Sequence, residues 1–149
     1  MRLPRRPRRQ PAQAGGRSTA ARVMLLVDTS VWVEHFRRGE TALADSLRHG
    51  AVLMHPFIAG ELACGNLKKR RAVLADLHAV PPARLASNQE VRQLIEARRL
   101  WGRGLGWIDA HLLASALLSG CRLWTLDRRL RGAAAELGLS GAGILPLRL

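Results

Sequence analysis

Two aspartates each follow a short apolar run that has the length of a β-strand. Asp28 comes after residues 24–27, and Asp127 comes after residues 123–126. If both runs are strands of one parallel sheet, the two carboxylates lie at the same edge, where open α/β sheets bind their ligands. Either aspartate could instead cap the helix that follows it, although Thr29 or Ser30 could take that position after Asp28. Both aspartates are candidates for a binding or catalytic site.

Two further acids stand in helical segments beside apolar residues. Asp109 is near the start of Trp107-Ile108-Asp109-Ala110-His111, where a negative charge also favours the helix dipole. Glu61 is flanked by apolar and small residues, so it faces either a lined cleft or a gap at the surface. His111 is expected on the helix surface and outside the chemistry. The other acids lie among polar residues and are interpreted as solvated charges: Glu34, Glu40, Asp45, Asp76, Glu90, Glu96 and Glu136.

A cluster of four carboxylates predicts a bound cation. Without one, the carboxylates would repel one another and raise their own pKa values. Oxygen ligands, with no histidine or cysteine at metal-binding spacing, favour Mg²⁺ or Mn²⁺ over zinc. Such an ion can orient and activate water, neutralise a phosphate and stabilise a leaving oxygen. The predicted chemistry is therefore metal-assisted hydrolysis of a phosphodiester.

Short apolar runs alternate with helical patterns from residue 24 onward, which is typical of an α/β fold with a mostly parallel sheet. The strands are expected at residues 24–28, 51–54 and 122–125, with an edge strand near 144–145. The helices are expected from Thr29 or Ser30 to Gly39, over 41–48, from Pro56, after 68–71, from a cap at Asn88, over 108–118, and after Asp127 to about 137.

The composition indicates one domain preceded by a basic tail. The chain has 149 residues and a formal net charge of +13, which usually indicates a polyanionic partner. Residues 1–22 hold seven arginines and no acid, which leaves +6 for the rest of the chain. This segment is predicted to be disordered. It could be a nucleic-acid-binding arm, but we favour Met24 as the true first residue.

Cellular location is predicted from cysteines and hydropathy. Two isolated cysteines, Cys64 and Cys121, suggest neither a disulfide framework nor a zinc site. No apolar run approaches the roughly 18 residues that a membrane span needs. A cytoplasmic protein is therefore expected.

Four motifs together resemble those of the PIN-domain family, and more narrowly the VapC-type toxins of bacterial toxin-antitoxin pairs. Any one motif is weak, but four in the right order and approximate spacing are fairly specific. The resemblance covers about residues 24–140. The motifs are Leu26-Val27-Asp28-Thr29-Ser30-Val31-Trp32, Glu61 in its helix, Ile108-Asp109-Ala110-His111-Leu112-Leu113-Ala114, and Thr125-Leu126-Asp127.

The resemblance implies a fold, an activity and partners. The fold is a three-layer α/β/α domain, here residues 23–149, and the activity is hydrolytic cleavage of RNA with Mg²⁺ or Mn²⁺. The partners are a second copy of the chain and a cognate antitoxin, a segment of which blocks the active-site groove. The basic tail has no counterpart in the family pattern. The implied metal pocket consists of Asp28, Glu61, Asp109 and Asp127, supported by the hydroxyls of Ser30 and Thr125.

Other functions fit the residues less well. A dinucleotide-binding module needs glycines directly after the first strand, and residues 28–32 have none. An aspartyl phosphatase needs a second aspartate where Ser30 stands. The alternative that remains is a catalytically inactive PIN-like module that binds RNA or an antitoxin. The run Lys68-Lys69-Arg70-Arg71 could contact phosphates, but we favour its interpretation as a solvated charge run.

Overall fold

The computed structural model describes residues 23–142 of the chain. The predicted basic tail and the edge strand expected near residues 144–145 lie outside the described residues. Within residues 23–142, no helix combines the length and the apolar composition that crossing a bilayer would require.

A parallel sheet of three short strands forms the centre of the described domain. It consists of β1 (Leu25–Val27), β2 (Val52–Leu53) and β3 (Arg122–Trp124), in the order β2-β1-β3. In the register, Leu26 of β1 faces Leu53 on one side and Leu123 on the other. All three residues of β1 are buried because β1 is the middle strand. The carboxyl ends of β1 and β3 therefore lie side by side, as the sequence predicted.

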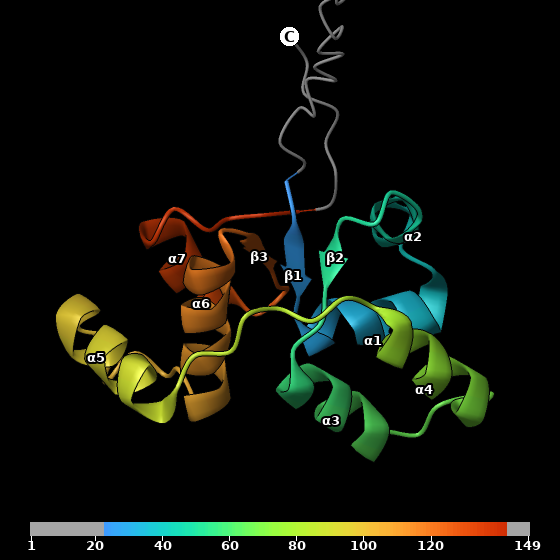
Figure 1. Ribbon diagram of the computed structural model, residues 1–149, viewed down its shortest axis with the longest axis horizontal. Helices are drawn as coiled ribbons and strands as arrows, with labels where there is room; N and C mark the ends of the chain where they lie inside the picture. The colour runs from blue at the N-terminus through green and yellow to red at the C-terminus, as the bar shows by residue number, and fades with distance from the viewer. Residues whose placement is uncertain (1–22, 143–149) are drawn as a thin grey trace, which may run out of the picture.

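Seven helices cover this sheet in the described part of the chain. Figure 1 shows the strands between two groups of helices, α1 to α4 on one side and α5 to α7 on the other. This is the three-layer α/β/α arrangement that was predicted. The helices are α1 (Thr29–Arg38), α2 (Thr41–Arg48), α3 (Pro56–Cys64), α4 (Arg70–Ala79), α5 (Asn88–Arg98), α6 (Trp107–Ser119) and α7 (Arg128–Glu136).

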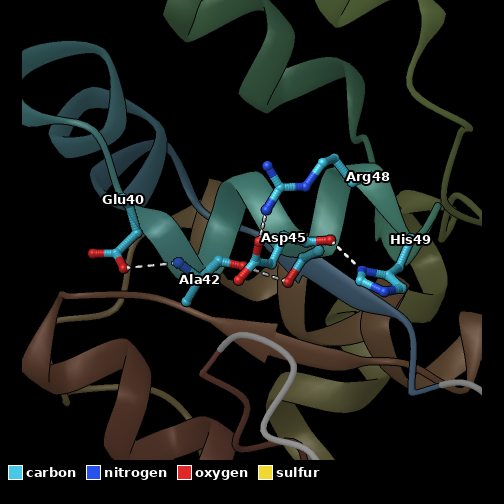
Figure 2. A network of polar contacts seen from close by, with 6 residues as sticks. Glu40, Ala42, Asp45, Arg48 and His49 are labelled. Carbon is cyan, nitrogen blue, oxygen red and sulfur yellow. Dashed lines mark hydrogen bonds and ion pairs between the residues drawn. The ribbon is translucent and has the colours of Figure 1, made fainter.

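Local sequence signals determine where several helices begin. Pro56 occupies the first turn of α3, as predicted. Glu40 accepts a hydrogen bond from the backbone N–H of Ala42 and so caps α2 (Figure 2). The prediction that Asn88 caps α5 was wrong by one residue. Ser87 is the cap, because Ser87 and Glu90 exchange hydrogen bonds in a capping box.

The core is formed where the sheet meets its helices. Its fully buried side chains come from all three strands and six helices, so an apolar core joins both helical layers to the sheet. They include Leu25, Leu26, Leu43, Ile58, Leu112, Leu113, Leu123 and Leu130.

Candidate active site

Asp28 lies at the end of β1, and two hydroxyls orient its carboxylate. Its Oδ2 accepts hydrogen bonds from Ser30 Oγ at 2.9 Å and from Thr125 Oγ1 at 2.8 Å. Asp28 occupies the backbone N-cap position of α1, but its side chain makes no capping hydrogen bond. Its carboxylate is therefore not used to begin the helix.

Asp127 lies three residues beyond the end of β3, and unlike Asp28 it caps its helix. Its Oδ1 accepts hydrogen bonds from the N–H groups of Arg129 at 2.9 Å and Leu130 at 3.1 Å. Its own N–H donates to Thr125 Oγ1 at 3.0 Å. Thr125 is 3% exposed, and its hydroxyl both accepts from Asp127 and donates to Asp28. This one buried side chain therefore sets the position of one aspartate relative to the other.

Asp109, in the first turn of α6, lies near enough to the other three acids for their charges to repel its carboxylate. Partial burial raises the pKa of its carboxyl, and repulsion by Asp28, Asp127 and Glu61 raises it further. A hydrogen bond from the Gly106 N–H to Asp109 Oδ2, at 2.8 Å, opposes this rise. The structure therefore brings all four predicted acids to one region, although they come from four separate segments of the chain.

Glu61 is exposed on α3 and lines a cleft of about 660 Å³. The walls of this cleft are largely apolar, and Arg37 and Lys68 add positive charge. Glu61 thus faces a lined cleft, one of the two surroundings expected from the sequence. The other lining residues are Thr29, Val33, Phe36, Leu62, Gly65, Asn66, Leu67 and Val73.

The donor set fits a hard divalent cation. Asp28, Asp109 and Asp127 each use one carboxylate oxygen in the hydrogen bonds described above, and among residues 23–142 the other oxygen accepts none. No ion pair in this part of the chain involves any of the four acids. The free oxygens do not yet converge, since no three such side chains there stand close enough to hold one ion.

The expectation that His111 lies on the helix surface was wrong. His111 is 4% exposed, and its ring packs against those of Phe57 and Trp107 at centroid distances of 4.9 and 4.6 Å. A second buried histidine, His55, lies 6.4 Å from it between ring centroids. His55 was not among the residues predicted to matter, although its place directly before Pro56 indicates a helix start. Both histidines are part of the interior.

Similar proteins show the family of this chain. The family model described as PIN domain matches residues 25–136. Two relatives, both named Ribonuclease VapC32 and from two strains of Mycobacterium tuberculosis, are each 47% identical over 121 residues. The match covers 78% of this chain and 95% of each relative. From the matched domain, the parallel sheet and this level of identity, we conclude that the chain belongs to the PIN-domain family and, within it, to the VapC type.

Proposed function

We propose that this protein is a metal-dependent endoribonuclease that acts as the toxin of a toxin-antitoxin pair. Its relatives carry the name ribonuclease, and their match extends over most of the chain. The edge of the sheet supplies the carboxylates that hydrolysis of a phosphodiester requires. The ligands proposed for the metal are Asp28, Glu61, Asp109 and Asp127.

The observation that carries this proposal is that four acids from separate segments lie near one another without an ion pair among the described residues. Three of these acids are close enough to Asp109 to repel its carboxyl and raise its pKa. A purely structural cluster of this kind would lower stability and bring no benefit. A divalent cation would remove the repulsion, because it neutralises the carboxylates that coordinate it.

The donor chemistry points to Mg²⁺ or Mn²⁺ at this edge. When bound, such an ion supplies Lewis-acid polarisation of the phosphate and a water of lowered pKa. The chain's own residues provide the positioning. Ser30 and Thr125 hold Asp28 Oδ2 and leave Oδ1 free, and the first turn of α7 holds Asp127 Oδ1 and leaves Oδ2 free.

The surface around the site supports the proposed substrate and partners. Arg37 and Lys68 in the cleft beside Glu61 provide positive charge for an RNA backbone. The apolar walls of the same cleft suit a segment of the antitoxin, which would block access to Glu61.

Large exposed apolar side chains near the helix starts, including Phe57 and Trp107, suit contact with a second copy of the chain. We further propose a cytoplasmic location and a domain extending over residues 23–149.

Cleavage of total RNA tests the proposed activity. The protein is incubated with RNA in Mg²⁺ or Mn²⁺ and, in parallel, in EDTA. Asp28→Asn and Asp109→Asn are compared with Asp76→Asn, a control that removes an exposed acid on α4. Circular dichroism confirms that each variant is folded. We expect cutting that requires the metal, persists in Asp76→Asn and is lost in the two site variants.

The other outcomes separate the alternatives. Equal cutting by all variants would refute the site assignment. A wild type that is inert across several RNA pools and both metals, yet binds RNA, would instead favour the inactive PIN-like module.

A further inference from the structure

Two of the four acids are connected through a hydroxyl, whereas a third is not. Thr125 joins Asp28 to Asp127, as described above. Asp109 belongs to α6, which packs mainly against α5 and β3, whereas α7 packs mainly against β3. The spacing of Asp109 from Asp127 therefore depends on contacts other than a broad α6–α7 interface.

The loop that precedes α6 provides such contacts. Arg103 forms a two-pronged ion pair with Glu136 near the end of α7, with Nη1–Oε2 and Nη2–Oε1 distances of 2.7 and 2.8 Å. The pairing lowers the pKa of Glu136. The Arg103 side chain is 32% exposed and that of Glu136 is 60% exposed, and the two-pronged arrangement restricts the geometry of the pair.

The next residue of the loop touches the opposite end of α7. Gly104 has φ of +74°, and a Cβ added there would lie 2.6 Å from Arg129 Nη1 and 2.8 Å from Arg129 Cδ. The Arg129 side chain therefore lies directly against the backbone of Gly104. The N–H of the same Arg129 donates to Asp127 Oδ1, so one residue contacts both the loop and the proposed ligand.

The loop then leads directly to Asp109. Leu105 packs against the hydrophobic core, and the Gly106 N–H donates to Asp109 Oδ2. A continuous set of contacts thus runs from Asp127 through Arg129 and the loop to Asp109.

We propose that residues 103–106, held to α7 by Arg129 and Glu136, form a brace that positions Asp109 relative to Asp127 for metal binding. This inference rests on the proposed function. Arg103, Gly104, Arg129 and Glu136 are positioning residues in this account, since none of them is a proposed ligand. Outer contacts of this type commonly change metal affinity by about 10- to 100-fold when they are removed.

The test is calorimetric titration of the full chain with Mn²⁺ in the absence of RNA. Arg103→Ala and Arg129→Ala are each expected to weaken Mn²⁺ binding by about 10-fold. The double exchange Arg103→Glu with Glu136→Arg is expected to restore affinity to near the wild-type value. Gly104→Ala is expected to weaken it as well, because its Cβ would displace Arg129.

A matched control separates positioning from stability. Arg48→Ala breaks an exposed ion pair with Asp45 on α2 (Figure 2), and we expect it to leave Mn²⁺ affinity unchanged. An ion pair that only stabilises the fold would lower the melting temperature without changing the affinity of the folded protein.

The possible outcomes distinguish failure of the brace, failure of the proposed function and failure of the ion pair as the positioning contact. Mn²⁺ binding of wild-type strength in folded Arg103→Ala and Arg129→Ala would refute the brace and leave the proposed function intact. Failure of the wild type itself to bind Mn²⁺ would refute the proposed function and, with it, the role of the brace. A loss in the single variants that the exchanged pair does not recover would refute the Arg103–Glu136 ion pair as the positioning contact.

Discussion

Low pH is expected to destabilise the fold through His55, a histidine that is buried directly before α3. His55 is 2% exposed, and its Nδ1 accepts a hydrogen bond from the Phe57 N–H at 3.0 Å. Because Nδ1 accepts, the proton of the neutral ring is on Nε2, which has no hydrogen-bond partner within the described chain. Protonation of Nδ1 would remove the cap of α3 and place a charge in the interior.

The direction and size of the effect follow from the pKa of His55. Burial, together with repulsion by His111, lowers this pKa from 6.5 to about 4. The unfolded chain therefore takes up a proton below pH 6.5, whereas the folded chain resists protonation until about pH 4. Stability is fully present above pH 6.5 and falls as the pH decreases through this window. The loss is about 2 kcal/mol at pH 5 and about 3 kcal/mol at pH 4.

Urea unfolding at pH 7 and pH 5 measures this loss. His55→Asn provides the comparison, because asparagine is a good N-cap residue and does not titrate. The variant is less stable than the wild type at pH 7, since the smaller side chain leaves a cavity. Its free energy of unfolding should nevertheless fall by about 2 kcal/mol less than that of the wild type between pH 7 and pH 5. Equal losses in the two proteins would refute the assignment to His55.

Three other substitutions test separate contacts. Thr125→Val should lower single-turnover RNA cleavage by at least about 10-fold in a folded protein, because it removes the hydroxyl between Asp28 and Asp127; an unchanged rate would contradict this role. Gly141→Ala should lower the free energy of unfolding by about 1 to 3 kcal/mol in urea, since its Cβ would lie 2.8 Å from Arg122 Cβ; a neutral result would argue against this close packing. Ser87→Ala should cost about 1 kcal/mol through loss of the capping box, whereas Asn88→Ala, matched in size, should cost less.

Features of the site could be predicted from the sequence where a pattern of neighbouring residues is compatible with only one local structure. An aspartate that follows an apolar strand lies beside the edge of the sheet, and in the structure Asp28 directly follows β1 while Asp127 lies three residues beyond β3. Pro56 marked the start of α3 because its missing N–H is tolerated in a first turn. The true cap of α5 could also have been recognised, since Ser87 and Glu90 have the spacing of a capping box.

Contacts between distant segments could not be predicted in this way. His111 is buried because Phe57, from another helix, packs against its ring, and nothing near His111 in the sequence encodes that contact. The ion pair of Arg103 with Glu136 joins residues 33 positions apart. Glu136 was accordingly interpreted as an ordinary solvated charge. The nearness of Glu61 to Asp109 likewise depends on how the layers pack.

In the proposed site, four acids from separate segments hold one metal ion. Replacing Mg²⁺ with Fe²⁺ and adding ascorbate and peroxide probes this shared site, because radicals formed at the ion cut the nearby backbone. If the four acids share the ion, mass spectrometry will map cuts close to Asp28, Glu61, Asp109 and Asp127, which excess Mg²⁺ suppresses and Asp28→Asn abolishes. Cuts confined to other segments, or a pattern unchanged in Asp28→Asn, would contradict a site shared by the four acids.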